Sequence, residues 1–203
     1  MTNLTIPRWM LLLFLIGCFG AWQHFRTREI VHDSGVLVSA VPLQTDAADT
    51  SSFPFKYSTL TPLRHFQVSA RVLSRADYSL DRGAALAPID LALGWGRMSD
   101  IAVLAQLSIH QTGRYYLWRA DKLPIPVDEI VASSSNMHLI PADDTIEREL
   151  RQTRIGDIVE LSGELVEARE ADGGIWRSSL SRSDTGNGAC ELVYVRQFTI
   201  HRR

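Results

Sequence analysis

The stretch GDIVELSGELVEARE, residues 156–170, constrains the fold of this chain more than any other stretch. Its apolar and polar residues alternate, which places Val159, Leu161, Gly163 and Leu165 on one side. A period of two is typical of a β-strand with one buried face. A glycine in mid-strand, here Gly163, indicates a bulge or a sharp bend. The stretch therefore predicts a long, bent strand.

The flanking segments predict a helix before this strand and two strands after it. DDTIERELRQTRIG predicts a surface helix that Asp144 caps, with Glu147 completing a capping box and Gly156 ending it. The pair Asp172-Gly173 predicts a hairpin turn between the long strand and IWRSSL, and CELVYVRQFTI predicts a last strand. Small barrels of the OB type close through a bent strand that enters a hairpin. We therefore expect an α+β, β-dominated fold with a small, possibly OB-like β-barrel domain and one or two surface helices.

The remaining body also favours strands. The segment 66–73 alternates with period two, residues 36–43 and 113–120 read as strands, and MHLIP predicts a strand ended by Pro141. Pro126 marks the start of a short helix. Small polar residues fill 44–52, which indicates a linker. We expect a short strand and polar linker over 35–54 and a globular domain over 55–203.

An uninterrupted apolar run extends from Trp9 to Trp22. As a helix it would span about 21 Å, and adding residue 6 and residues 23–25 brings it near the roughly 30 Å of a membrane core. Residues 1–34 therefore predict a membrane anchor with an exit helix, with 6–25 in contact with the membrane. Alternatives are a cleaved signal peptide, a lipoprotein signal in which LIGC makes Cys18 the lipidated residue, or a buried helix.

The anchor implies a single-pass membrane protein with its carboxy-terminal domain outside the cytoplasm. Lys and Arg are nearly balanced on the two sides of the apolar run, so the positive-inside rule does not fix this orientation. The formal net charge is −2, which supplies no basic surplus to neutralise phosphates and argues against nucleic acid as a partner. None of the six histidines has metal-ligand spacing, and no cofactor motif is present, so neither a metal nor a cofactor is expected.

The stretch SSLSRSDTGNGACE, residues 178–191, has two interpretations. As a turn, it uses Asp184 for an Asx-type bond and its glycines for positive φ. As a binding loop, it joins an aromatic face to charged groups that hold carboxylates, phosphates or sugar hydroxyls. A second glycine-rich stretch, GWGRMSD, either displays Trp95 or packs it in the core. The binding interpretation predicts a surface made of Trp176, Arg177, Arg182, Asp184, Asn187, Trp95 and Asp100.

Cys190 also has two interpretations. As a nucleophile it needs a neighbouring base and an orienting group, and His138 and Asn136 would supply them. As a structural residue it is a small buried side chain at the start of the last strand. The sequence does not show whether these three residues meet.

The segments APIDLALGWGRMSD, NMHLIPAD and WRSSLSRSDTGNGACE together resemble an uncharacterised family of bacterial membrane-anchored proteins, over roughly Phe55 to Val195. The resemblance implies a bacterial envelope setting and assigns no catalytic role. Together with the expected anchor, it implies a single-pass protein of a bacterial inner membrane with its carboxy-terminal domain in the periplasm. We expect a binding or interaction module without chemistry of its own, whose ligand is a protein partner or an envelope component. The alternatives are a cysteine-dependent hydrolase or transferase, and a structural subunit of an inner-membrane complex.

Overall fold

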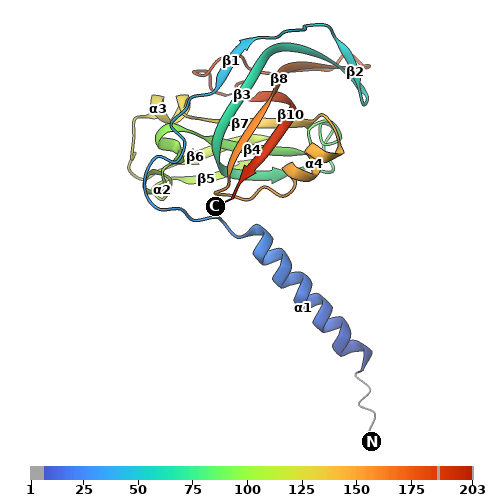
Figure 1. Cartoon of the computed structure of the whole chain (residues 1–203), viewed down its shortest axis with the longest axis vertical. Helices are drawn as coiled ribbons and strands as arrows, with labels where there is room; N and C mark the ends of the chain where they lie inside the picture. Colours follow the sequence, from blue (N-terminus) through green and yellow to red (C-terminus); the bar gives the residue numbers. More distant parts are fainter. Residues whose placement is uncertain (1–6, 187, 203) are drawn as a thin grey trace, which may run out of the picture.

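The computed structural model describes residues 7–186 and 188–202, and within them the strands form one eight-stranded sheet and one separate two-stranded sheet (Figure 1). The strands are β1 (Leu43–Asp46), β2 (Phe53–Phe55), β3 (Ser58–Asp77), β4 (Ile89–Gly94), β5 (Ser108–Thr112), β6 (Tyr115–Arg119), β7 (Ser134–Pro141), β8 (Ile158–Glu170), β9 (Ile175–Arg177) and β10 (Glu191–His201). The helices are α1 (Arg8–Thr27), the 3-10 helix η1 (Gly96–Ser99), α2 (Ile101–Leu104), α3 (Val127–Ala132) and α4 (Asp144–Leu150).

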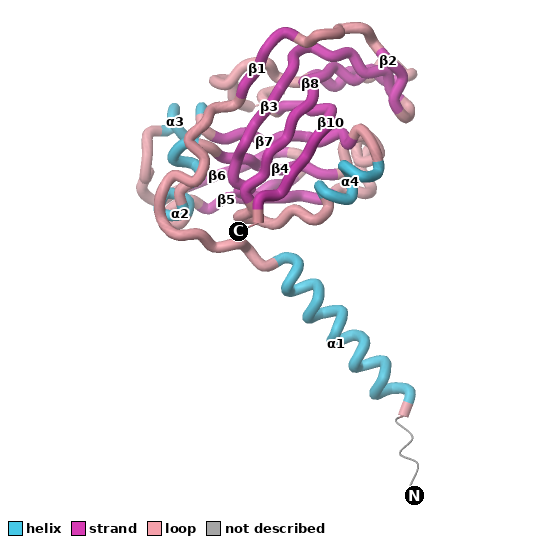
Figure 2. The backbone as a smooth tube through the Cα atoms, in the orientation of Figure 1, coloured by secondary structure: helices cyan, strands magenta, loops and turns pink. Residues whose placement is uncertain are grey.

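The large sheet is mixed, with the order β1-β3-β4-β7-β10-β8-β9, and β2 pairs with β3 (Figure 2). The β7–β10 ladder is parallel, and the other ladders are antiparallel. β3 also pairs with β8, so that the central ladders form a closed circuit. The expected small OB-like β-barrel is corrected to an eight-stranded mixed sheet, in which β1, β2 and β9 lie outside this circuit. β1 and β2 pair with the 20-residue strand β3, and β9 pairs with β8.

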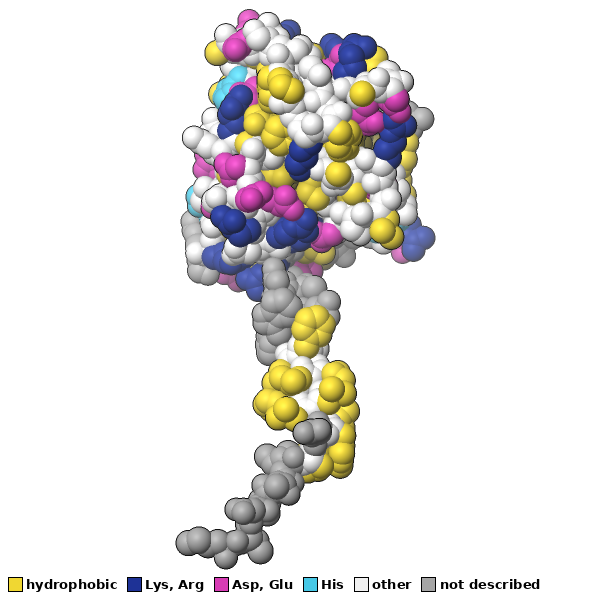
Figure 3. Space-filling model, turned by 90° about the vertical axis from the view of Figure 1, so that its right-hand side faces the viewer, with side chains coloured by type: hydrophobic (Ala, Val, Ile, Leu, Met, Phe, Trp, Pro, Cys, Tyr) yellow, Lys and Arg dark blue, Asp and Glu magenta, His cyan; other side chains and the backbone are white. Residues whose placement is uncertain are grey.

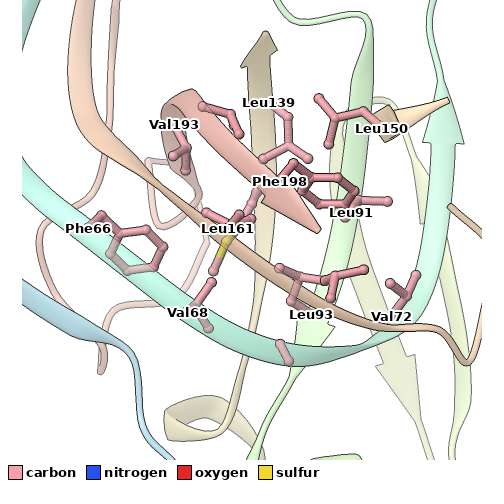
Figure 4. Packing of buried hydrophobic residues seen from close by; sticks show 14 of the residues in the cluster. Phe66, Val68, Val72, Leu91, Leu93, Leu139, Leu150, Leu161, Val193 and Phe198 are labelled. Atoms are coloured by element: carbon pink, nitrogen blue, oxygen red, sulfur yellow. The ribbon is translucent and has the colours of Figure 1, made fainter. Parts of the chain in front are cut away.

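The main core lies between two groups of strands, with β3, β8 and β10 on one side and β4 and β7 on the other (Figure 4). The predicted alternation in β3 and β8 is confirmed, because the apolar positions of both strands are buried in this core. Gly163 lies so close to β10 that a Cβ atom there would come 2.0 Å from the Tyr194 carbonyl oxygen. The register of β10 shifts next to this contact, between Val195 and Gln197, so the predicted irregularity at Gly163 is present.

The predicted membrane anchor is wrong. Among the described residues, no helix is both long and apolar enough to cross a membrane. α1 has 20 residues, but its sequence also contains Arg8, Gln23, His24 and Arg26, which limit the apolar stretch. The inner-membrane location and the periplasmic placement that depended on the anchor are contradicted with it. Residue 6 of the predicted span lies outside the described residues.

The described apolar side chains of α1, including Trp9 and Phe14, are exposed, and the helix extends away from the body (Figure 3). Cys18, the predicted lipidation site, is an exposed free cysteine on this helix. Nothing in the structure tests its modification.

The predicted strand over 36–43 is also wrong, because loop contacts satisfy its backbone. The N–H groups of Leu37 and Val38 donate to Ser99 Oγ, at 3.0 and 3.1 Å, and the Gly96 N–H donates to the Val38 carbonyl at 2.8 Å. The first strand, β1, instead begins at Leu43 and occupies part of the predicted linker.

The predicted surface helix is present as α4, but its cap is shifted by one residue. Asp143 Oδ1, and not the Asp144 carboxylate, accepts from the N–H groups of Thr145 and Ile146. The helix ends at Leu150, well before Gly156. Ile146 and Leu150 enter the main core, which holds α4 against the end of the two strand groups.

Candidate functional site

Polar residues gather on the outward face of β4 and β7. Met137 and Leu139 of β7 point into the main core, so Asn136 and His138 between them point to the opposite face. On β4, Asp90 pairs with His138 in the ladder and faces the same way. These three polar side chains are buried, because the β5–β6 hairpin and the segments around Trp176 and Cys190 cover them.

Arg114 connects the hairpin to this face. Its guanidinium lies 3.1 Å from Asp90 Oδ1, donates to both oxygens of Asp81 at 2.7 and 3.0 Å, and stacks over Tyr78 and Trp176. The backbone places it there: Gly113 and Arg114 form the hairpin tip with φ of 55° and 68°, and a positive φ at a non-glycine residue is uncommon. The backbone of the tip therefore adopts an uncommon conformation. This conformation places the Arg114 guanidinium against the buried Asp90 carboxylate.

His138 completes what we call the Arg114 cluster, made of Tyr78, Asp81, Asp90, Arg114, His138 and Trp176. The His138 ring packs on the Trp176 ring with centroids 4.8 Å apart. Its Nδ1 lies 2.9 Å from Asp90 Oδ2, an ion-pair distance, although the two atoms lack hydrogen-bond geometry. The cluster thus packs a guanidinium, two carboxylates and an imidazole against two aromatic rings, and within it His138 Nδ1 and Asp90 Oδ2 are buried without a hydrogen bond.

Next to this cluster lies a pocket of about 220 Å³, which we call the hairpin pocket. The β5–β6 hairpin, α3, the start of β7, and residues 184–186, 189 and 190 line it. Asn136 and Cys190 lie at the side nearest the Arg114 cluster, since the Asn136 amide donates to the Arg114 carbonyl at 3.0 Å. The lining consists of Tyr115, Tyr116, Leu117, Trp118, Val131, Ser134, Ser135, Asn136, Asp184, Thr185, Gly186, Ala189 and Cys190.

The 178–190 loop is both a structured turn and a wall of this pocket. Ser179 closes its base by donating its N–H to the Cys190 carbonyl at 3.0 Å. Ser179 Oγ donates to Asp184 Oδ2 at 2.6 Å and accepts from the Ser181 N–H at 3.0 Å. Gly186 and Gly188 both have φ of 85°. The two sequence interpretations of this loop are therefore compatible.

A buried carboxyl group, Glu191, lies beneath the loop. Arg182 Nη1 is 2.6 Å from Glu191 Oε1, and Ser135 Oγ donates to Oε2. Burial raises the pKa of Glu191 to about 7, against the opposing effect of Arg182 and Ser135. Together with Asp184 and Trp95, these groups line a smaller void of about 20 Å³ beside the hairpin pocket.

Cys190 has the surroundings of a structural thiol. Burial raises the pKa of Cys190 to about 11, and the nearby acids Glu191, Asp90 and Asp184 act in the same direction. Asn136 Nδ2 lies 3.7 Å from Sγ, which brings together two of the three residues of the enzyme interpretation. The third, His138, is engaged with Asp90 and Trp176. The geometry thus favours the thiol form at neutral pH, and nucleophilic chemistry needs the thiolate.

The structure brings part of the predicted binding surface together and separates the rest. Arg182 and Asp184 lie beside the pocket, and Trp95 is 2% exposed and contacts the same void from the core side. Trp176 belongs to the Arg114 cluster. Arg177 lies 2.5 Å from Glu167 on an exposed edge, and Asp100 caps α2 by accepting from the Ala102 N–H. Asn187 lies outside the described residues.

Several residues of the site were not predicted from the sequence. Asp90 carried a signal, because it is an acid at an alternate position within the apolar run 87–95. The hairpin residues Tyr116 and Trp118 were visible only as an aromatic strand. Arg114 carried a weaker signal, the Gly-Arg pair between two short strands. Among the described residues, no group of three or more His, Cys, Asp or Glu side chains is arranged to hold a metal ion.

Comparisons with protein-family models, with curated proteins and with solved structures found no match to this chain. The resemblance to a family of bacterial membrane-anchored proteins stays a prediction.

Proposed function

We propose that this domain is a binding module that holds an apolar or aromatic group of its ligand in the hairpin pocket and performs no chemistry of its own. The observation that carries the proposal is the lining of the pocket: aromatic and aliphatic side chains form its walls and small polar groups lie at one side. Ligand sites commonly combine a mostly apolar wall with a few polar groups that fix orientation.

The polar side of the pocket is already rigid. Ser134 Oγ donates to the Ile130 carbonyl at 2.7 Å, and Tyr116 donates to Ser134 Oγ at 3.3 Å. Asn136 accepts from Gln111 at 2.5 Å and donates to the Arg114 carbonyl. Because these side chains are held before a ligand arrives, binding orders few groups, which favours affinity.

The volume of the hairpin pocket limits the size of the ligand group that it can hold. A space of about 220 Å³ is smaller than most drug-sized sites and suits one ring or one side chain. A protein partner that inserts a single side chain is therefore the occupant that best agrees with the expected interaction role.

Filling the pocket tests the proposal. p-Cresol, a neutral ring with one hydroxyl, is titrated into the full chain and followed by Trp fluorescence and by ligand-observed NMR. We expect a dissociation constant on the order of 1 mM for such a fragment. Val131→Phe should abolish the binding, because Val131 lines the pocket.

Val127→Phe is the matched control. Val127 is on the same helix, α3, is 46% exposed and does not line the pocket. Equal binding by the wild-type chain and by Val131→Phe would contradict the proposal, as would loss of binding in both variants.

A further inference from the structure

The described lining of the hairpin pocket contains an acid and no base, which favours a cationic ligand over an anionic one. Asp184 is the one charged side chain that lines it among the described residues, and neither Lys, Arg nor His contributes to that described lining. Three aromatic residues, Tyr115, Tyr116 and Trp118, line the same space. Aromatic faces with a carboxylate attract cations, and quaternary ammonium groups in particular are bound in aromatic cages.

The two nearby cations, Arg182 and Arg114, do not make the hairpin pocket favourable for an anion. Arg182, the nearest cation in the adjacent void, is paired with Glu191 and lies over the Phe66 ring. Arg114 is 17% exposed and directs its guanidinium toward Asp81 and Asp90, and only its backbone carbonyl meets Asn136. An anionic ligand would therefore meet an acid and aromatic faces without a cationic partner.

Asp184 is positioned to act on a ligand. One of its oxygens, Oδ2, accepts from Ser179 Oγ at 2.6 Å, which fixes the carboxylate at the rim of both voids. The residue is exposed on the loop, so its carboxylate is hydrated in the absence of ligand. A cation that enters between this carboxylate and the rings gains both contacts.

We propose that the group held in the hairpin pocket is an organic ammonium ion, either free or at the end of a methylated lysine side chain. The inference rests on the proposed binding function and specifies its ligand. The ammonium group would lie against the rings of Tyr116 and Trp118, which share one face of β6, with Asp184 as its counter-ion.

A pair of probes with the same shape tests the role of charge. Choline and its neutral isostere 3,3-dimethylbutan-1-ol are titrated into the full chain by isothermal calorimetry and NMR. We expect choline to bind at least about tenfold more tightly, a ratio that corresponds to a single favourable charged contact. Val131→Phe should abolish binding of both probes.

Asp184→Asn tests the counter-ion. The variant keeps an oxygen that accepts from Ser179, so the loop structure is retained. Affinity for choline should fall about tenfold, whereas affinity for the isostere should not change. Asp121→Asn, at an exposed acid that does not line the pocket, is the control and should leave both affinities unchanged.

The source of the ammonium group is separated by a third probe, Nα-acetyl-trimethyllysine methylamide. Tighter binding of this probe than of choline supports a protein side chain, and the reverse supports a free small molecule. Equal affinity for choline and the isostere, no binding of choline at 10 mM, or an Asp184→Asn variant that binds choline like the wild type would overturn the inference. If p-cresol still binds in a Val131-dependent manner in those cases, the proposed binding function stands and the ammonium assignment alone fails.

Discussion

The Arg114 cluster and the hairpin pocket lie side by side on the outward face of the sheet, yet they use their polar groups in opposite ways. In the cluster, Arg114 contacts two carboxylates and two aromatic rings, and the buried Asp90 has a cation at 3.1 Å. In the pocket, the rings of the hairpin border open space, and Asp184 has one described hydroxyl partner. A polar group whose partners are all within the chain supports the fold, whereas one at the edge of an open space is available to a ligand.

Removing the cation of the cluster should have the largest effect. Arg114→Met leaves Asp90, which is fully buried, without its cation, and breaking a buried ion pair in this way is strongly destabilising. We expect the free energy of unfolding in urea to fall by about 4 kcal/mol.

The same substitution at Arg119, at the exposed end of β6, should change stability by less than about 0.5 kcal/mol. Adding Asp90→Asn to Arg114→Met should recover part of the loss, because the uncompensated charge is then gone. A stable Arg114→Met variant would show that the cluster does not support the hairpin, and the contrast with the pocket would disappear.

The reactivity of Cys190, which lines the hairpin pocket, tests whether this region carries out chemistry. Its pKa of about 11 leaves little thiolate at pH 8, compared with a free thiol of pKa near 8.5. In a Cys18→Ser background, we expect iodoacetamide to alkylate the native chain about a hundredfold more slowly than the urea-unfolded chain. A native rate equal to or above the unfolded rate would restore the cysteine-dependent enzyme as an interpretation.

Glu191, in the small void beside the hairpin pocket, should make stability depend on pH. Its folded pKa of about 7 lies above the ordinary value of 4.5, so between these values the folded chain binds a proton that the unfolded chain has lost. The stability from this group is therefore greatest at low pH and is lost as pH rises through 7, by roughly 2 to 3 kcal/mol between pH 5 and pH 8.

Urea unfolding at both pH values measures this change, and Glu191→Gln should reduce the difference by that amount. Glu160→Gln, at a side chain that is 46% exposed, is the control and should keep the wild-type difference. If Glu191→Gln keeps the wild-type pH dependence, a group other than Glu191 binds the proton that the folded chain retains.

Local patterns predicted the long strands and the Asp172-Gly173 turn, but the strand expected over 36–43 is absent. The alternation in β3 and β8 and the Asp172-Gly173 turn were readable because each depends on neighbouring residues. The membrane anchor failed for a related reason, since the apolar run of α1 is shorter than its helix and the flanking polar residues set the limit.

The site itself was less predictable, because it depends on pairing between distant segments. Asn136 meets Cys190 through the parallel β7–β10 ladder, whose register no local pattern specifies. Trp95 between two glycines was compatible with display or burial, and the structure buries it. Arg177 was predicted as a ligand contact, but the β8–β9 ladder places it opposite Glu167.

The β5–β6 hairpin forms its own two-stranded sheet, and this has a consequence for motion. No ladder among the described residues joins it to the eight-stranded sheet, and an isolated hairpin is at best marginally stable. The hairpin can therefore unfold locally while the large sheet remains intact, and its amide hydrogens should exchange with solvent sooner than those of β7. The Arg114 side chain, which pairs with Asp81 and Asp90 outside the hairpin, limits this local opening.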